Sequence, residues 1–407
     1  MKCRHCDSGE LHPFLDLGFA PPSNAYLREV DLSRQQIFLP LRVSVCIDCW
    51  LVQTEDYVTA ADLFTDEYAY FSSTSSGWLE HAKVYARNII SRLDLNDKSL
   101  VLEVACNDGY LLKNFHAQGI PCLGIEPTAS TADRAENLGI PVVRDFFSEN
   151  LALGLAKDGP LADLIIGNNV YAHVPDVNDF TRGLKVALAP TGTITLEMPH
   201  LMRLLEFTQF DTIYHEHFSY FSLYTIEQIF AAFGLRVWDV EELPTHGGSI
   251  RIYGCHAEDQ RATRPSVAAL MDEETRRGMR SLPAYTELQL RAEKIKNEFL
   301  KFLIDKKREG KSVLAYGAAA KGNTLLNYAG VRSDLLPGVY DAAESKQGLF
   351  MPGSGIPIYH PEALSELAPD YVVILPWNLA DEIVNQESRL REAGTRFVIA
   401  APELRLI

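Results

Sequence analysis

The chain has no long apolar run. It contains no stretch of about 18 consecutive apolar residues, which a membrane-spanning helix requires. The first residues, Met1-Lys-Cys-Arg-His-Cys6, lack the apolar core of a secretory signal. We therefore expect a cytoplasmic protein without a membrane partner.

Positive charge is also scarce. Lys and Arg number 38 against 54 Asp and Glu, so the formal net charge is −16, and no run rich in Lys or Arg occurs. Proteins that bind nucleic acids need a basic face to displace counterions from the phosphates. The charge balance therefore predicts no nucleic-acid partner.

Cysteine is rare, but its placement is informative. Of seven cysteines, four form two C-x-x-C pairs, Cys3/Cys6 and Cys46/Cys49. In a reducing compartment such pairs bind metal more often than they form disulfides. Four thiolates close a tetrahedral zinc site and leave no position for water or substrate. We predict structural zinc in a small N-terminal domain, over the alternatives of a catalytic zinc or a nucleic-acid-binding ribbon.

The central region lacks the G-x-G-x-x-G turn of dinucleotide-binding proteins. Its first predicted strand ends instead in Asn107-Asp108-Gly109, and the acid Glu126 closes the next predicted strand. An acid at that position usually accepts hydrogen bonds from a ribose. A turn rich in acids and poor in phosphate-binding groups suits a ligand with a ribose and a positive charge, such as S-adenosylmethionine.

Five apolar runs alternate with helical patterns in this region. They are predicted as strands at residues 100–104, 121–125, 141–143, 162–167 and 192–199. Strands and helices at this spacing are typical of a doubly wound parallel sheet, with the ligand at the carboxyl ends of the strands.

Histidine and tyrosine gather after the fifth strand. Tyr214-His215-Glu216-His217 places two histidines around an acid. The spacing differs from that of the zinc-binding H-E-x-x-H helix. The open alternatives are a core network of hydrogen-bonded His and Glu, or a catalytic group on the ligand side of the sheet. Further on, residues 245–249 form a glycine-hinged turn beside a predicted strand at 250–253.

The last part of the chain begins with charged, helix-forming segments at residues 265–308. Strands are predicted at 312–316, 338–341 and 371–375, which indicates a smaller Rossmann-like domain. Backbone amides at the helix N-terminus after the first of these strands suit a phosphate, and Lys321 adds positive charge. A tight turn without a ligand is the alternative.

Four short motifs follow one another along the central region. They are E-V-A-C-N-D-G at 103–109, G-I-E-P at 124–127, D-F-F at 145–147 and N-N-V-Y-A-H-V at 168–174. This series resembles the motifs of class I methyltransferases. With its four-cysteine module and C-terminal domain, the whole chain resembles the zinc-containing sugar C-methyltransferases, which act at C-3′ of nucleotide-linked 4-keto-deoxysugars. That family has Asn where many methyltransferases have Gly, and this chain shares the feature at Asn107.

The resemblance implies an α/β fold with three folded parts. A doubly wound class I methyltransferase domain lies between an N-terminal four-cysteine zinc-binding domain and a C-terminal Rossmann-like domain joined by helices. We expect a zinc-binding domain at 1–65, a methyltransferase domain at 66–264, a helical connector at 265–311 and a sugar-nucleotide-binding domain at 312–407.

The resemblance also assigns residues to each ligand. The expected catalytic residues are Tyr68, His173, Tyr214, Glu216 and His217. The S-adenosylmethionine site is expected to comprise Glu103, Asn107, Gly109, Glu126, Pro127, Asp145, Phe146 and Asn168. The nucleotide-linked keto-sugar is expected to contact His246, Lys321, Asp341, Trp377 and Asn378.

Methyl transfer to carbon explains why a histidine cluster would be needed. A carbon next to a ketone becomes nucleophilic only after a proton leaves, so a base must take the proton and a donor must stabilise the enolate oxygen. Histidine, with a pKa near 6.5, suits the base. We predict His217 as base and Glu216 as the residue that orients or charges it, while Tyr68, His173 and Tyr214 contact the carbonyl or relay the proton.

Three other functions use parts of the same pattern. A small-molecule O- or N-methyltransferase would keep the cofactor motifs, because an alcohol or amine already has a lone pair. A non-catalytic zinc-ribbon interaction protein is opposed by the intact Glu103 and Glu126 and by the His/Glu cluster. A nucleic-acid methyltransferase is opposed by the acidic balance. The sequence leaves open the exact sugar, its nucleotide, the stereochemistry and the choice between monomer and homo-oligomer.

Overall fold

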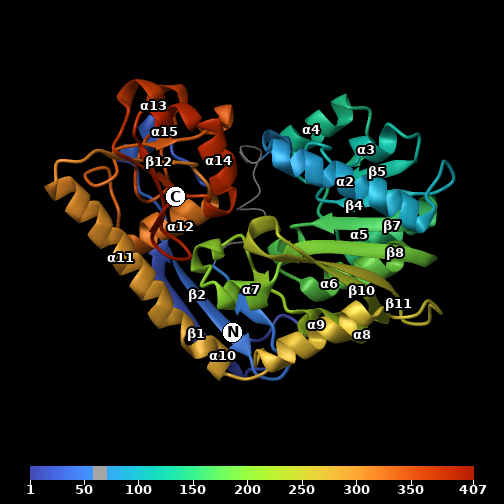
Figure 1. Ribbon diagram of the computed structural model, residues 1–407. Helices are drawn as coiled ribbons and strands as arrows, with labels where there is room; N and C mark the ends of the chain where they lie inside the picture. Colours follow the sequence, from blue (N-terminus) through green and yellow to red (C-terminus); the bar gives the residue numbers. More distant parts are fainter. Residues whose placement is uncertain (58–70) are drawn as a thin grey trace.

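The computed structural model describes residues 1–57 and 71–407. In these ranges the strands form three sheets, and Figure 1 shows them as an N-terminal, a central and a C-terminal unit. Their strand orders are β1-β2-β3-β9, β10-β11-β8-β7-β4-β5-β6 and β14-β13-β12-β15-β16-β17. The predicted α/β class, with a methyltransferase-type central sheet between a four-cysteine unit and a second α/β unit, is confirmed.

The N-terminal sheet is antiparallel. It consists of β1 (Leu11–Ala20), β2 (Leu39–Cys46), β3 (Val52–Thr54) and β9 (Ser219–Tyr220). The fourth strand, β9, comes from beyond the central sheet and pairs with β3. The residues after the His/Glu cluster therefore belong to the N-terminal sheet, which the sequence did not indicate.

The central sheet has a parallel core with an antiparallel edge. Its strands are β4 (Val101–Val104), β5 (Cys122–Ile125), β6 (Val142–Val143), β7 (Ala162–Asn168), β8 (Leu188–Pro199), β10 (Leu235–Leu243) and β11 (Ser249–His256). The five predicted parallel strands are all present, and the last begins at Leu188 instead of Gly192. The chain runs outward from β4 to β5 on one side and returns to β7 on the other. The carboxyl ends of β4 and β7 therefore flank the point where open α/β sheets hold ligands.

Short helices connect these strands. They are α2 (Ser76–Leu93), α3 (Lys113–His116), α4 (Ala129–Asn137), α5 (Glu149–Asp158), α6 (Val177–Ala187), α7 (Leu201–Glu206) and α8 (Leu223–Ala232). Helix α2 begins after Ser75, whose side chain accepts a hydrogen bond from the backbone N–H of Trp78, as an N-cap does. It buries Ala82, Tyr85, Ala86 and Ile89 against the central sheet.

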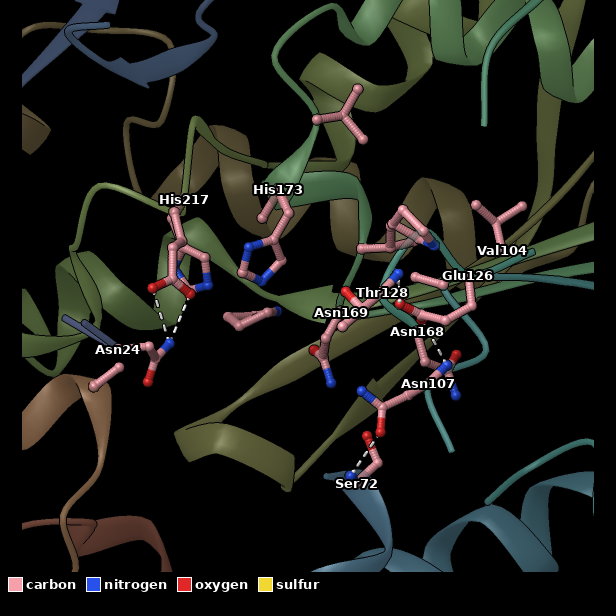
Figure 2. Close-up of a pocket in the computed structure, with 18 of the residues that line it drawn as sticks. Asn24, Ser72, Val104, Asn107, Glu126, Thr128, Asn168, Asn169, His173 and His217 are labelled. Carbon is pink, nitrogen blue, oxygen red and sulfur yellow. Dashed lines mark hydrogen bonds between the residues drawn. The ribbon is translucent and has the colours of Figure 1, made fainter. Parts of the chain in front are cut away.

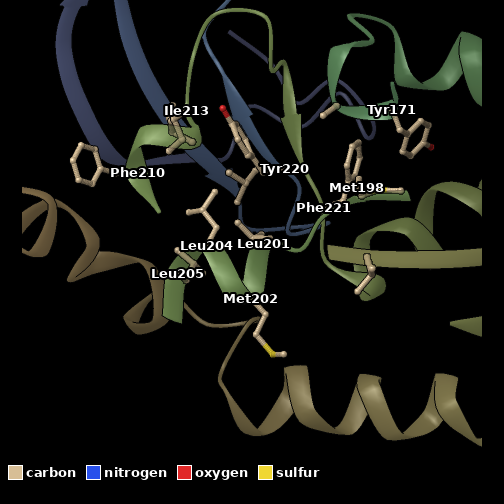
Figure 3. Packing of buried hydrophobic residues seen from close by; sticks show 14 of the residues in the cluster. Tyr171, Met198, Leu201, Met202, Leu204, Leu205, Phe210, Ile213, Tyr220 and Phe221 are labelled. Carbon is tan, nitrogen blue, oxygen red and sulfur yellow. The ribbon is translucent and has the colours of Figure 1, made fainter. Parts of the chain in front are cut away.

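Apolar side chains fix the segment between β8 and β9. Figure 3 shows Phe221 and Leu201 on the side of Met198 of β8 and Phe210 farther away beside Ile213, and all of these residues are buried in one cluster. Residues 214–217 lie between two buried apolar side chains, Ile213 and Phe218. The polar residues in between are therefore held in place from both sides.

The C-terminal unit follows a helical connection. The connecting helices are α9 (Pro265–Arg276), α10 (Pro283–Thr286) and α11 (Leu288–Arg308), all within the helix-forming stretch predicted at 265–308. The unit itself contains β12 (Val313–Tyr316), α12 (Ala320–Ala329), β13 (Val339–Tyr340), β14 (Ile358–Tyr359), α13 (Glu362–Leu367), β15 (Tyr371–Ile374), α14 (Ala380–Gln386), α15 (Ser388–Glu392), β16 (Arg396–Ile399) and β17 (Arg405–Leu406). Strand β12 pairs in parallel with β13 and β15. In Figure 1, α11 runs from the N-terminal sheet to the C-terminal unit.

Single turns of 3-10 helix complete the described chain. They are η1 (Glu29–Ser33), η2 (Ser72–Thr74), η3 (Tyr171–His173), η4 (Phe210–Thr212), η5 (Thr245–Gly247), η6 (Glu344–Lys346) and η7 (Trp377–Leu379). In the described part of the chain, no helix is both long enough and apolar enough to cross a membrane.

Candidate active site

A cavity of about 610 Å³ opens at the carboxyl ends of β4, β5 and β7. Its wall includes residues from all three units, and Figure 2 shows part of it. At one end lie Asn107, Glu126 and Asn168 of the central sheet, and at the other lie His173 and His217. We call these the cofactor end and the acceptor end.

The turn after β4 is held in left-handed backbone conformations. Ala105, Asn107 and Gly109 have φ values of 57°, 50° and 76°. A Cβ on Gly109 would lie 2.7 Å from the Cδ1 of Ile140 and 3.2 Å from the Cα of Ala135, so only glycine allows the turn to pack this closely on α4. The predicted motif is thus explained by backbone geometry, and its Asn107 occupies a conformation that Asn tolerates better than most residues.

Glu126 is fixed at the end of β5. Its Oε2 accepts the backbone N–H of Asn107 over 3.0 Å, and its Oε1 accepts that of Thr128, also over 3.0 Å. Burial raises the pKa of the carboxyl, and the two backbone donors oppose this rise. Each oxygen retains a lone pair, so the side chain can still accept hydrogen bonds from ribose hydroxyls.

Glu103 and Gly109 lie behind the cavity wall. Glu103 is 1% exposed, and burial, followed by the charges of Asp108 and Glu126, raises the pKa of its carboxyl well above the usual value. Neither residue is part of the wall, whereas Asn107, Glu126 and Pro127 are. Glu103 and Gly109 therefore support the turn from below.

Three more residues predicted to bind the cofactor line the cavity wall at and after the ends of β6 and β7. They are Asp145, Phe146 and Asn168. Phe146 is 42% exposed and offers an apolar ring face, with Asp145 beside it. Asn168 lines the cavity, and both its Oδ1 and its Nδ2 are buried without a hydrogen-bond partner among the described residues. Buried amides are normally satisfied, so Asn168 fits a site for a polar ligand.

His217 has a defined tautomer at the acceptor end. Its Nδ1 lies 2.9 Å from the carbonyl oxygen of Thr212, which can only accept, so Nδ1 carries the proton and Nε2 is the basic nitrogen. Its ring centroid is 3.9 Å from that of Tyr214 and 4.6 Å from that of His173. Burial, then the neighbouring His173, lowers the pKa of His217 well below 6.5. The ring is therefore neutral near pH 7 and able to take a proton.

The two segments that carry the predicted catalytic residues are tied together through their backbones. The N–H of Phe218 donates to the carbonyl of Ala172 over 2.8 Å, which joins the segment of His217 to that of His173. Burial lowers the pKa of His173 to about 4. Tyr214, Glu216, His217 and His173 all line the cavity. Tyr68, the fifth predicted catalytic residue, lies outside the described residues.

The N-terminal sheet supports this segment. Thr54 donates from Oγ1 to the carbonyl of His217 over 2.9 Å. Arg4, inside the first cysteine pair, donates from Nε to the carbonyl of Phe218 over 3.2 Å. His215 donates from Nε2 to Pro40 over 3.1 Å and is absent from the cavity wall. The segment thus presents Tyr214, Glu216 and His217 to the cavity and His215 to the N-terminal sheet.

The C-terminal unit adds a cation to the acceptor end. Lys321 lines the cavity, and its Nζ donates to the Oδ1 of Asn378 over 2.6 Å. It also lies 4.7 Å from the ring centroid of Trp377. Burial lowers the pKa of Lys321 to about 8, against the opposing charge of Asp211. Trp377 donates in turn to Asp211 over 2.7 Å.

The other residues predicted for the substrate divide into two groups. His246 lines the cavity with a φ of 54°, and its Nε2 lies 3.3 Å from the Nδ2 of Asn169. Asp341 and Trp377 are outside the wall. Asp341 accepts backbone N–H groups from Ala318 and Ala343 over 2.6 and 2.8 Å, so it shapes the turn after β12.

Several wall residues were not predicted. They are Asn24, Ser72, Trp78, Asn169 and Lys346. Trp78 stacks on His81 at 4.9 Å and lies 5.3 Å from His246. Asn169 belongs to the N-N-V-Y-A-H-V motif, so this residue had a signal in the sequence. Asn24 and Lys346 reach the cavity only through the packing of units that are distant in the sequence.

The four predicted zinc ligands converge. The sulfur atoms of Cys3, Cys6, Cys46 and Cys49 all lie within 4.8 Å of one another. Cys3 and Cys49 are 3.4 Å apart and Cys6 and Cys46 are 3.6 Å apart. A tetrahedral zinc with bonds of about 2.3 Å places its sulfurs about 3.8 Å apart. The arrangement therefore fits a closed four-thiolate zinc site, as predicted.

The sequence matches three family models in succession. Residues 3–64 match a putative zinc-binding domain, 78–240 a methyltransferase domain and 244–402 a C-methyltransferase C-terminal domain. A full-length relative is the C-methyltransferase NovU of Streptomyces niveus. It is 34% identical over 406 residues, which cover 100% of this chain and 96% of NovU.

Solved structures resemble the chain only in part. An S-adenosylmethionine-dependent methyltransferase from Clostridium acetobutylicum is 10% identical, with a TM-score of 0.34 over 44% of this chain and 91% of its own. The magnesium protoporphyrin IX methyltransferase of Synechocystis, solved with bound S-adenosylmethionine, is 13% identical, with a TM-score of 0.33 over 43% and 79%. Because these scores are low, the family assignment rests on the family models and the full-length relative.

Proposed function

Since the chain belongs to the zinc-containing, S-adenosylmethionine-dependent sugar C-methyltransferases, we propose that it methylates C-3′ of a nucleotide-linked 4-keto-deoxysugar. We propose dTDP as the nucleotide, deoxysugar biosynthesis as the context and the cytoplasm as the location. We retain the division at residues 65, 264 and 311 as part of this proposal.

One observation carries the proposal. A neutral histidine with a basic Nε2 lies in the same cavity as the predicted cofactor turn, next to a buried carboxylate and a tyrosine. Methyl transfer to an alcohol or amine has less need of such a base. Removing a proton from carbon does need one, because the C–H bond next to a ketone ionises only with help.

The chain's own residues divide the reaction between them. His217 takes the C-3′ proton on Nε2, and Glu216 balances the imidazolium that forms. Tyr214, His173 and Tyr68 donate to the carbonyl oxygen as it becomes an enolate, or relay the proton. S-adenosylmethionine, when bound, supplies an electrophilic methyl group on a sulfonium. Cys3, Cys6, Cys46 and Cys49 would hold the zinc ion, which would supply structural rigidity, and four thiolates would leave no ligand position for substrate.

The cofactor end is proposed to hold the methyl donor. Glu126 accepts from the ribose hydroxyls, and Asp145 with Phe146 contacts the adenine. Asn107, Pro127 and Asn168 complete this end, while Glu103 and Gly109 keep the turn in shape.

The diphosphate is proposed to bind at the N-terminus of α12. Ala319, Ala320 and Lys321 line the cavity there. The backbone amides and the ammonium group both favour an anion. His246 and Asn378 contact the sugar or the phosphates, and Asp341 with Trp377 holds the surrounding turns.

Product analysis tests the proposal. The enzyme is incubated with S-adenosylmethionine and a panel of nucleotide-linked sugars, some with a 4-keto group and some fully reduced. We expect a new C–CH₃ group at C-3′, observed by NMR, from keto-sugars only. A methyl group on oxygen, nitrogen or another carbon would contradict the proposal and favour the O- or N-methyltransferase alternative.

A further inference from the structure

The loop between β1 and β2 brings an N-terminal residue into the cavity. Asn24 lines the wall, and its Nδ2 lies 2.9 Å from Oε1 and 2.7 Å from Oε2 of Glu216 (Figure 2). The loop sequence Pro21-Pro-Ser-Asn24 has no motif that marks a site. Asn24 belongs to the N-terminal unit, which carries the four predicted zinc ligands, and yet it contacts a predicted catalytic side chain.

The loop is fixed on both sides of this contact. Tyr26 donates from its hydroxyl to the carbonyl of Ala318 over 2.5 Å. Leu27 and Phe350 exchange two backbone hydrogen bonds of 3.0 and 2.8 Å. The loop thus docks onto the C-terminal unit, and Asn24 has little freedom to leave Glu216.

The contact favours one protonation state of the acid. Glu216 is 1% exposed, and burial alone disfavours an ionised carboxylate. A carboxylate that is ionised only accepts hydrogen bonds, and Asn24 offers its N–H group to both oxygens. Donation to the charged form favours that form. The amide oxygen of Asn24 is turned away from Glu216 in Figure 2.

Other ionisable groups surround the carboxylate. Tyr26 lies on the same loop as Asn24, and the charge of Glu216 contributes to its raised pKa. His173 faces the backbone of Glu216, and His217 follows it in the chain. Lys346, from the C-terminal unit, lies 5.6 Å from the ring centroid of Tyr26. Glu216 therefore lies beside both predicted catalytic histidines, through its backbone for His173 and through the chain for His217.

We propose that Asn24 is a positioning residue for catalysis, which keeps the Glu216 carboxylate ionised and in one orientation beside the base. This inference rests on the proposed carbon methylation, in which Glu216 balances the charge that develops on His217. It gives the N-terminal unit a direct part in the active centre in addition to zinc binding.

A double-mutant cycle tests whether Asn24 acts through Glu216. The variants are N24A, E216Q and N24A/E216Q, with N150A on the exposed surface of α5 as control. We expect N24A to lower kcat by about 10- to 100-fold, as a small misplacement of a catalytic group does. In the E216Q background the same change should cost less than about threefold, because the residue it positions is already altered. Zinc content and the Kd for S-adenosylmethionine should stay unchanged.

A pH profile separates positioning from simple structural support. N24D replaces the donor by a second carboxylate and should shift the acid limb of kcat toward higher pH by about one unit. N150D, which adds the same charge at the surface, should not shift it. Equal fold losses from N24A with and without E216Q, or a kcat of N24A within twofold of wild type, would overturn the inference.

The same cycle can be followed without any substrate. If the wild type methylates none of the keto-sugars, the proposed function fails, and unfolding free energies of the four proteins still measure the Asn24–Glu216 coupling. We expect this coupling near pH 7 and its loss once the carboxylate is protonated. If the enzyme is active and Asn24 and Glu216 are coupled in the free energy of unfolding but not in kcat, Asn24 has only a structural role. That result would overturn this inference and leave the proposed function intact.

Discussion

The two ends of the cavity are built in different ways. The cofactor end comes from consecutive strand ends of one parallel sheet, and its turn is set by local backbone geometry. The acceptor end is assembled from the N-terminal loop, the segment after β8 and the N-terminus of α12. The cofactor end thus uses a compact local motif, whereas the position of the proposed base depends on contacts between three units.

The two ends also differ in charge. Glu103, Asp108 and Glu126 crowd the cofactor end, and burial raises the pKa of Glu103 and of Glu126. At the acceptor end, burial lowers the pKa of His217 and of Lys321, which is the shift expected for cations. This polarity suits a positively charged methyl donor at one end and an anionic nucleotide-sugar at the other.

Removal of the proposed base, His217, should have the largest effect and should affect only the acceptor end. H217N keeps the size of the side chain nearly constant but cannot take the proton, so kcat should fall by about 10³- to 10⁴-fold. The Kd for S-adenosylmethionine, measured by calorimetry, should remain within about twofold because the cofactor end is built independently. H116N, on the exposed surface of α3, is the matched control. Turnover of H217N near that of wild type would contradict the assignment.

Loss of the zinc site should also lower activity through the acceptor end, although the four cysteines lie outside the cavity wall. In C49A the cysteine pairs no longer close, and the supports of the catalytic segment from Thr54 and Arg4 loosen. We expect loss of bound zinc by metal analysis and a fall in kcat of about 10²-fold. C255A, which removes a buried thiol outside the cluster, should retain zinc. Loss of S-adenosylmethionine binding together with kcat would show that zinc supports both ends.

Loss of the ribose acceptor should affect the other end. E126Q weakens the hydrogen bonds to the ribose and leaves the acceptor segment untouched. We expect the Kd for S-adenosylmethionine to rise by about 10- to 100-fold, since a hydrogen bond to a charged group contributes about 1.5 to 3 kcal/mol. At saturating donor, kcat should fall by less than about threefold. A large loss of kcat with unchanged Kd would place Glu126 in the chemistry instead.

The acid sensitivity of the fold should come from the acceptor end. The pKa of His173 and of His246 falls from 6.5 to about 4 because burial disfavours the imidazolium. Below pH 6.5 the unfolded chain therefore binds protons that the folded chain does not, so stability should fall as the pH drops from 6.5 to about 4 and be independent of these groups above 6.5. Denaturant unfolding at several pH values measures this slope. H246N should flatten it, and an unchanged slope would contradict the buried histidines as the cause of the acid sensitivity.

The contrast between the ends also explains what could be predicted from sequence. The five parallel strands, the turn at Asn107 and the acid at Glu126 follow from local patterns, and the structure has them at or near the expected residues. The cysteine spacing predicted the zinc cluster because two C-x-x-C pairs restrict the possible ligands. Local rules therefore sufficed for the fold class and for most of the cofactor end.

Only part of the acceptor end could be predicted from the sequence. Tyr214, Glu216 and His217 stood out by residue type, but their link to the N-terminal sheet through β9 had no signal, because two-residue strands are set by tertiary packing. Asn24 lies in an irregular loop and Lys346 in a single 3-10 turn, and no periodicity distinguishes these polar residues. Glu103, Asp341 and Trp377 have chemically suitable side chains, but packing places them, like the backbone of Gly109, behind the wall.

Solvent-hydrogen exchange at the acceptor carbon tests the central claim most directly. A nucleotide-linked 4-keto-sugar is incubated in D₂O without S-adenosylmethionine, and deuterium at C-3′ is followed by NMR for wild type, E126Q and H217N. The independence of the two ends predicts exchange at similar rates in wild type and E126Q, and none above background in H217N. Exchange that persists in H217N, or that disappears in E126Q, would contradict it.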